Sequence, residues 1–194
     1  MHPTIARFWP EALALHEFLE ELFTCEVRED APYDHYIPVN RSRVKRIRKQ
    51  LTLSPELIAA ARGAVPETRW LIVNEHWCGD GAQILPVLEA IAIASEGRIE
   101  ARACYRDADT DLIDAFLTNG GRSIPKLIQF RASGEVTATW GPRPEEATAL
   151  VRQVKSDPDP TIAANYGQPL HAWYTENRQQ AIQKELLEVL AQAR

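Results

Sequence analysis

Cys78 is the residue of this sequence best placed for chemistry, because it stands where a short apolar run ends and a helical pattern begins. At a helix start, unpaired backbone amides and the positive end of the helix dipole face the sulfur and favour thiolate over thiol. The thiolate is the form that attacks disulfides, and Gly79 and Gly81 leave room for the backbone of a partner. The segment therefore predicts a reactive thiol. The alternative is a small apolar residue buried at a helix start.

The residues beside Cys78 carry further chemistry. His76 could carry a proton or stabilise the thiolate, or it could be an exposed loop histidine. Asp80 lies in the first helical turn, where a carboxylate suits the helix dipole but opposes a neighbouring thiolate, so capping of backbone amides is the favoured role. Trp77 is expected at the rim of the site, where an aromatic ring excludes water and offers a contact surface.

Three cationic side chains belong to segments expected around the site. Arg106 follows the second predicted strand, Lys126 follows Pro125, and Arg122 is placed similarly. Each could bind the carboxylates of a peptide thiol such as glutathione or supply positive potential. The alternative for each is a solvated surface charge.

The elements that must position these residues follow from the apolar periodicity of the middle of the chain. The pattern predicts strands that alternate with helices, in the order strand, helix, strand, helix, strand, strand, helix. Residues 98–105 alternate in polarity, which predicts an edge strand. Ala132-Ser-Gly predicts a hairpin turn. The predicted strands are 70–74, 98–105, 126–130 and 135–140, and the predicted helices are 78–95, 109–117 and 145–155.

Both flanks of this α/β core read as helical. A helix from Pro10 to Phe23, an irregular stretch over 33–39, a basic helix over 41–49 with Val44 and Ile47 inward, and a helix over 56–62 capped by Ser54 are expected. Residues 157–160 predict a stiff linker, and residues 170–193 one amphipathic helix with Trp173 inward. The predicted organisation is a helical extension over 1–66, a core over 67–155, and a linker and helix over 156–194 that pack on the core as one globular unit.

Two separated motifs carry a family resemblance. Trp77-Cys78-Gly79-Asp80, with Pro86 in the helix that follows, resembles the active-site segment of the thioredoxin superfamily, and Ser123-Ile124-Pro125 resembles its cis-proline loop. The whole chain also resembles a bacterial thioredoxin-like subgroup with Trp-Cys-Gly-Asp followed by a small residue. The resemblance covers residues 67–155. It implies a mixed sheet of about four strands between helices, a cis Ile124–Pro125 bond, and a loop that packs beside Cys78.

The chain departs from that family at two positions. Gly81 replaces the second, resolving cysteine, which in the dithiol mechanism attacks the mixed disulfide. The buried aspartate that assists that cysteine in thioredoxins is replaced by Ile72. The resemblance thus implies a monothiol mechanism: Cys78 forms mixed disulfides that an outside low-molecular-weight thiol, such as glutathione, resolves as co-substrate. No other cofactor and no metal are expected, and the expected partners are disulfide-containing proteins or small thiols.

The two remaining cysteines are weaker candidates for the resolving role. Cys104 is expected near the end of a strand next to residues 70–74, on the correct edge of the sheet. Cys25 ends the first predicted helix and could approach only if that helix packs over the site. The alternative for both is a buried inert thiol.

Composition limits the class of protein. The 194 residues have 45% hydrophobic and 25% charged content, as in ordinary globular proteins. A net charge of −5 argues against nucleic acid as the main partner, and the basic run at 41–49 is interpreted as a solvated helix face balanced by acids. Three cysteines are too few for a disulfide framework, which predicts a cytoplasmic location. Neither a signal peptide nor a membrane span is expected.

Three functions compete on these grounds. The first is a monothiol oxidoreductase that uses Cys78. The second is a thioredoxin-fold binding module whose exposed cis-proline surface holds an extended peptide or a partner protein. The third, metal or iron–sulfur binding through Cys78 in a dimer with glutathione, has no supporting cysteine or histidine cluster in the sequence.

Overall fold

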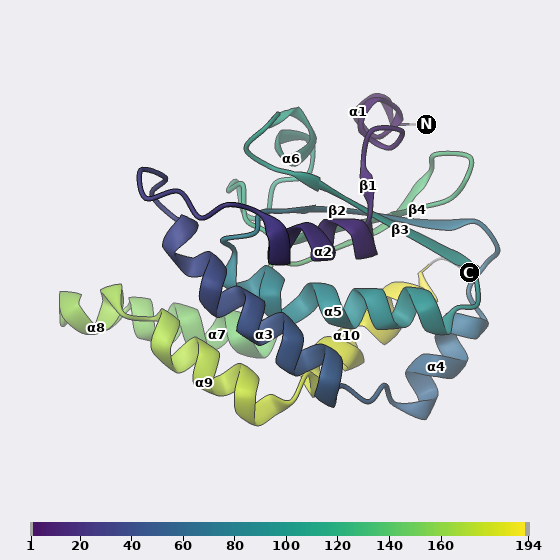
Figure 1. The fold of residues 1–194 in the computed structure, drawn as a ribbon. Helices are drawn as coiled ribbons and strands as arrows, with labels where there is room; N and C mark the ends of the chain where they lie inside the picture. The colour runs from purple at the N-terminus through teal and green to yellow at the C-terminus, as the bar shows by residue number, and fades with distance from the viewer. Residues whose placement is uncertain (1, 193–194) are drawn as a thin grey trace.

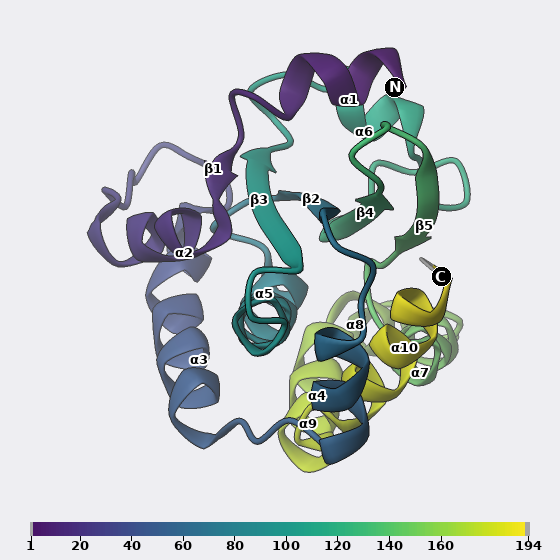
Figure 2. The same cartoon turned by 90° about the vertical axis from the view of Figure 1, so that its right-hand side faces the viewer.

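A mixed five-stranded sheet forms the centre of the computed structural model, which describes residues 2–192. The strands lie in the order β1-β3-β2-β4-β5 (Figures 1 and 2). Only β2 and β3 pair in parallel, and every other neighbouring pair is antiparallel. The strands are β1 Leu13–Ala14, β2 Thr68–Asn74, β3 Ile99–Tyr105, β4 Lys126–Phe130 and β5 Val136–Trp140.

Helices cover both faces of the sheet. The short helices α1 and α6 lie over one face, and α5 with most other helices lies over the opposite face (Figures 1 and 2). The helices are α1 Pro3–Phe8, α2 Leu15–Thr24, α3 Ile37–Gln50, α4 Pro55–Arg62, α5 Gly79–Ala94, α6 Asp111–Ala115, α7 Glu145–Lys155, α8 Pro160–Ala164, α9 Gly167–Asn177 and α10 Gln180–Ala191. The predicted α/β class is confirmed, with five strands in place of about four.

Strand β2 shows why the central apolar run is continuous. Trp70 and Ile72 belong to the large core cluster shared with α5, whereas Leu71 and Val73 belong to the cluster shared with α1 and α6. All four side chains are 0–1% exposed. A strand covered by helices on both faces needs apolar residues at every position, which is the pattern that predicted it.

The N-terminal region differs from the predicted single helix over residues 10–23. The chain instead forms α1, then β1, and α2 begins only at Leu15. Leu13 and Ala14 pair antiparallel with Ala103 and Arg102 of β3. The prediction that β3 is an edge strand is therefore wrong: β1 satisfies part of its outer hydrogen-bonding edge, a long-range pairing that local periodicity does not encode.

The C-terminal region also differs from expectation. The predicted single helix is two helices, α9 and α10, because Arg178 and Gln179 adopt positive φ values of 49° and 63°. Its predicted end at residue 193 lies outside the described residues. Trp173 is only half-buried, and the next residue, Tyr174, is 0% exposed instead.

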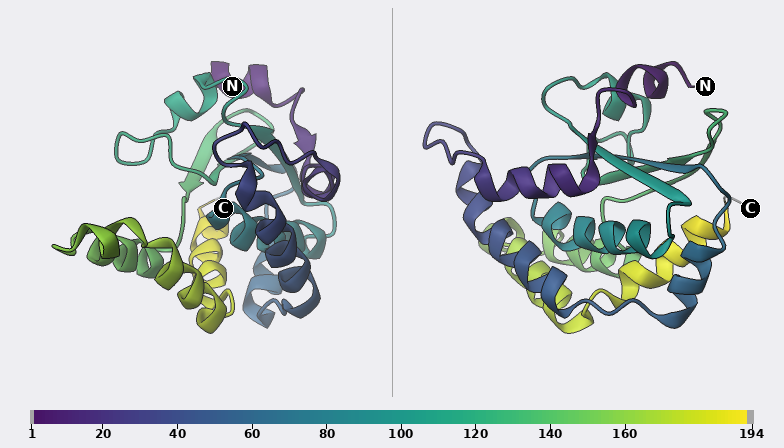
Figure 3. Two further views of the ribbon diagram at one scale, coloured as in Figure 1. Left: turned by 60° about the vertical axis from the view of Figure 1, so that its left-hand side comes forward. Right: turned by 45° about the vertical axis from the view of Figure 1, so that its right-hand side comes forward.

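Two other flanking segments are more helical than expected. The predicted stiff linker at 157–160 leads directly into α8, and the predicted irregular stretch contains a short 3-10 helix, Asp34–Tyr36, and the start of α3. In the left view of Figure 3, α8 and the start of α9 project from the rest of the molecule.

The remaining elements agree closely with the periodicity. Ser54 caps α4 by accepting the Leu57 N–H at 3.2 Å, α7 spans the predicted residues, and β4 and β5 form the predicted hairpin. Val44 and Ile47 of the basic helix are buried at 0% and 1% exposure. No helix among residues 2–192 is long and apolar enough to cross a membrane.

Candidate functional site

Cys78 occupies the turn from β2 into α5, as predicted, and serves as the N-cap of that helix. Its Sγ accepts the Gly81 N–H at 3.3 Å and donates to the Ile124 carbonyl oxygen at 3.4 Å. The Ile124–Pro125 peptide bond is cis. The helix start and the proline loop thus enclose the sulfur, and Cys78 is only 6% exposed.

The electrostatic state of Cys78 differs from expectation. Burial, followed by the charge of Asp80, raises the pKa of the Cys78 thiol to about 12, although the Gly81 and Asp80 N–H groups and Arg143 act in the opposite direction. The prediction that the helix start yields a thiolate is therefore wrong for this structure. Desolvation of a buried sulfur outweighs the favourable helix dipole.

Asp80 does not take the amide-capping role that its position predicts, because Cys78 fills it. Its carboxylate lies inside the protein, where the Arg143 guanidinium binds it at 2.6 Å and the Tyr174 hydroxyl donates to it at 2.7 Å. Burial raises the pKa of Tyr174 well above its ordinary value. Asp80 therefore joins the β5–α7 loop and α9 to the start of α5.

Helix α9 fills the space that Gly79 leaves open. A Cβ at Gly79 would lie 2.9 Å from the His171 ring and 3.3 Å from Nη1 of Arg43. The glycine thus permits close approach, as predicted, but the partner in this structure is the chain's own side chains.

Gly81 is likewise enclosed. A Cβ at this position would lie 2.3 Å from Oδ1 of Asn74, whose side chain is buried and donates to the Glu75 carbonyl oxygen. The space in which a resolving cysteine would begin is filled by Asn74. Ile72 is fully buried in the apolar core.

The cis-proline loop is covered rather than exposed. Ile124 is 6% exposed and Pro125 is buried. Gly141, with φ of 111°, packs so closely that a Cβ there would lie 2.3 Å from the Pro125 carbonyl oxygen. The expectation of an exposed peptide-binding surface at this loop is therefore wrong.

The three cysteines are free thiols on different parts of the fold. Cys104 packs against the apolar cluster that contains Cys78, and burial raises its pKa to about 12. Cys25 packs against the other cluster, and its Sγ donates to the Leu22 carbonyl oxygen. A resolving role for Cys104 stays a prediction. The described residues hold no group of three or more His, Cys, Asp or Glu side chains that could bind a metal ion.

His76 is directed into the neighbouring helix and strand. Its ring lies against Phe18 and Tyr105, and its Nε2 is 2.8 Å from the Tyr105 hydroxyl. Burial lowers the pKa of His76 to about 4, so the imidazole is neutral at pH 7.

The three candidate cations have different surroundings. Arg106 lies over the Trp77 ring, 5.0 Å from its centroid, and pairs with Asp107. Arg122 pairs with Asp114 at the surface. Lys126 is 5% exposed and donates to Thr118 Oγ1, and burial lowers its pKa. Arg106 is thus the cation that the structure places against a site residue.

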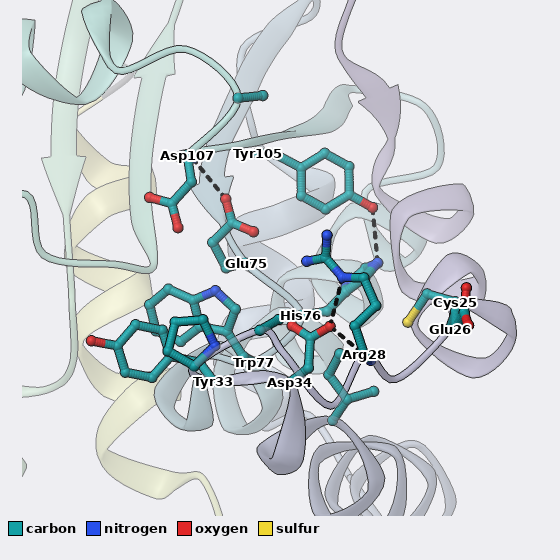
Figure 4. A pocket seen from close by; sticks show the side chains of 14 residues that line it. Cys25, Glu26, Arg28, Tyr33, Asp34, Glu75, His76, Trp77, Tyr105 and Asp107 are labelled. Atoms are coloured by element: carbon teal, nitrogen blue, oxygen red, sulfur yellow. Dashed lines mark hydrogen bonds and ion pairs between the residues drawn. The ribbon is translucent and has the colours of Figure 1, made fainter.

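A pocket of about 660 Å³ opens beside Trp77 (Figure 4). Trp77 and Tyr33 stack there with ring centroids 4.7 Å apart. One side of the pocket is the segment between α2 and α3, and the other is the carboxyl ends of β2 and β3. The lining side chains labelled in Figure 4 are Cys25, Glu26, Arg28, Tyr33, Asp34, Glu75, His76, Trp77, Tyr105 and Asp107.

The sequence analysis missed several residues that shape this region. Arg143, His171 and Tyr174 come from segments that only the tertiary fold brings to α5. Asn74 and Glu75 precede the Trp77-Cys78-Gly79-Asp80 motif, with His76 between, and their polar types at the end of an apolar strand were a usable signal.

Lowering the pH from 6.5 to 4 is expected to destabilise the fold through His76 and His171. Burial is the main cause that lowers the pKa of each imidazole to about 4, from the ordinary value of 6.5 expected in the solvent-exposed unfolded chain. The unfolded chain therefore binds more protons in this window, so this stability is complete above pH 6.5 and falls as the pH drops toward 4. Urea denaturation at pH 7.5, 6 and 5 measures the slope.

A matched pair of variants isolates this effect from the titration of carboxylates. His171→Gln is expected to flatten the dependence of unfolding free energy on pH, whereas His16→Gln, at an exposed position of α2, is expected to keep the wild-type slope. Equal slopes for all three proteins would contradict the assignment.

Comparisons with known proteins agree with this architecture. A family model described as thioredoxin matches residues 27–155. Two crystal structures share the fold: a protein of unknown function from Pseudomonas aeruginosa, with 17% identity, 94% of each chain covered and a TM-score of 0.63, and an HIV epitope scaffold, with 15% identity, 96% of each chain covered and a TM-score of 0.66. No curated protein matches the chain. With two well-separated motifs and most of its length matched, this chain belongs to the thioredoxin family.

Proposed function

We propose that this protein is a thioredoxin-fold binding module that holds a segment of a partner polypeptide in the pocket beside Trp77. One contrast carries the proposal: the Cys78 thiol is 6% exposed, whereas a pocket of about 660 Å³ is open on the other side of the same turn. Pockets of this size bury ligands as large as a drug molecule, which is more than one amino-acid side chain. The turn is therefore better suited to binding than to chemistry at sulfur.

The contact surface continues outside the pocket. Tyr33, Tyr36 and Val39 are exposed by 49%, 46% and 42%, and all three belong to the segment that lines the pocket and begins α3. Large apolar side chains gathered beside a cavity are typical of surfaces that bind other proteins.

Monothiol exchange at Cys78 is the second candidate, favoured by the position of its sulfur at the N-cap of α5 with the Gly81 N–H bonded to it. In that reaction the Cys78 thiolate attacks one sulfur of a disulfide and releases the other as a thiolate. A glutathione-type thiolate then attacks the partner sulfur of the mixed disulfide, which breaks the bond to Cys78, frees the Cys78 thiolate and leaves the partner joined to glutathione by a disulfide. The raised pKa opposes the first step, because very little thiolate is present at pH 7.

The rate of alkylation against pH separates the two candidates. In a Cys25→Ser/Cys104→Ser background, we expect iodoacetamide to modify Cys78 more slowly than it modifies free cysteine. The rate should still rise at pH 10 without a plateau, since the pKa is about 12. A plateau below pH 8, together with Cys78-dependent turnover of a glutathione mixed disulfide, would favour the monothiol enzyme.

Peptide binding tests the module itself. A fluorescein-labelled library of ten-residue peptides is expected to show binding by anisotropy, and Trp77→Ala is expected to weaken it at least tenfold. Ile93→Ala removes an apolar side chain that is 73% exposed on α5 and is expected to leave binding unchanged. If no peptide binds, or if both variants behave alike, the proposal is wrong.

A further inference from the structure

Glu75 is a buried carboxylate at the wall of the Trp77 pocket. It follows β2 directly and is 9% exposed. Its Oε1 accepts the backbone N–H of Asp107 at 2.8 Å. Among residues 2–192, no cationic side chain forms a salt bridge with it. A buried carboxylate is stabilised when a cation forms a charge-assisted hydrogen bond with it. Glu75 lines the pocket, so a ligand in the pocket can reach it.

No other charged side chain among the described residues of the pocket lining forms a salt bridge with Glu75. Arg28 is the one cationic side chain among the described lining residues, and it pairs with Asp34 at 3.1 Å. Asp107 pairs with Arg106, and His76 is neutral at pH 7 because burial lowers its pKa. Glu75 and Glu26 therefore form no salt bridge within the described part of the lining. The charge of Arg106 acts on Glu75 from a distance, but burial outweighs it and raises the pKa of the Glu75 carboxyl.

Nearby charged groups outside the lining do not change this balance. Arg41 donates to the Leu22 and Cys25 carbonyl oxygens, and Glu21 accepts the Tyr105 hydroxyl. The region thus stays acidic overall.

Aromatic side chains complete the pocket. Figure 4 shows Glu75 between Trp77 and Tyr105, with the Arg28–Asp34 pair facing it. Trp77 stacks on Tyr33 at 4.7 Å. Aromatic faces attract cations, and they also pack against the aliphatic stems of lysine and arginine.

We propose that this pocket takes a lysine or arginine side chain of the partner polypeptide, with the cation bound to Glu75 and its stem packed against the aromatic side chains of the lining. This inference rests on the proposed binding function. A polypeptide is the occupant rather than a small amine, because the pocket exceeds one side chain in size, and Tyr33 of its lining is followed in the chain by the exposed side chains of Tyr36 and Val39.

Ten-residue peptides that differ only at the central position test the charge preference. We expect peptides with central Lys or Arg to bind at least tenfold tighter than those with Gln, and those with Glu to bind more weakly still. Glu75→Gln keeps an oxygen for the Asp107 N–H but removes the charge, so it is expected to abolish the preference. Glu56→Gln, at an exposed position of α4, is expected to retain it.

Each failure has its own meaning. Peptide binding that depends on Trp77 but ignores the central residue, or that survives Glu75→Gln, would overturn the basic specificity and leave the binding module standing. Cadaverine or agmatine binding as tightly as the Lys or Arg peptide would overturn the polypeptide occupant. If no peptide binds, both proposals fail.

Discussion

Replacing Arg143 with methionine is expected to lower the free energy of unfolding by about 3 kcal/mol. The substitution removes the cation that binds the Asp80 carboxylate directly. Asp80 is 7% exposed and keeps the Tyr174 hydroxyl as a donor, with Arg43 acting only through its charge. Removal of one partner of a buried ion pair is costly because the remaining charge is uncompensated. Chemical denaturation at pH 7 measures the difference.

Two companion variants show whether burial is the cause. Arg62 pairs with Glu96 at 2.9 Å, but both side chains are more than half exposed, so Arg62→Met is expected to change stability by less than about 1 kcal/mol. Asp80→Leu combined with Arg143→Met removes both charges and is expected to recover much of the loss. A double variant as unstable as Arg143→Met alone would show that the charge is not responsible.

Gly81→Ala is expected to lower the free energy of unfolding by about 2 kcal/mol, which is the second large effect. Its Cβ would lie 2.3 Å from Oδ1 of Asn74, and both residues are buried. In an Asn74→Ala background the space is free, so the same substitution is expected to cost at least ~1 kcal/mol less. A double-mutant cycle by denaturant titration measures this coupling.

Gly121→Ala provides the control for this cycle. A Cβ there meets its nearest atom at 3.5 Å, an ordinary contact, and we expect no dependence on Asn74. If Gly81→Ala costs the same with and without Asn74, steric exclusion is not what keeps position 81 a glycine. If the coupling is found, a second cysteine at position 81 also requires a smaller residue at position 74.

The strands and the principal helices could be predicted because their signals are local. Strand β2 is apolar over residues 70–73 since helices cover both faces, and α5 begins at Gly79 with Cys78 as its N-cap, close to the predicted start. Strand β1 could not be predicted, because two residues form a strand only through their pairing with Ala103 and Arg102. The break at Arg178 and Gln179 likewise involves residue types that do not require positive φ.

The candidate site shows a second limit. Cys78 and the proline motif predicted where the site lies, but they did not predict the protonation state of the Cys78 sulfur. The local helix start favours a thiolate, whereas the neutral thiol results from burial, to which the Ile124 loop from a distant part of the chain contributes. The capping role predicted for Asp80 fails for the same reason, because its partners Arg143 and Tyr174 are far from it in sequence.

Strand β1 also bears on self-association. An open strand edge presents unpaired N–H and C=O groups on which a second copy can add a strand, the first step toward aggregates. Two residues of β1 occupy the outer edge of β3 at Arg102 and Ala103, and α2 follows immediately beside them. The two-residue strand β1 thus blocks the addition of a strand from a second copy at this part of β3.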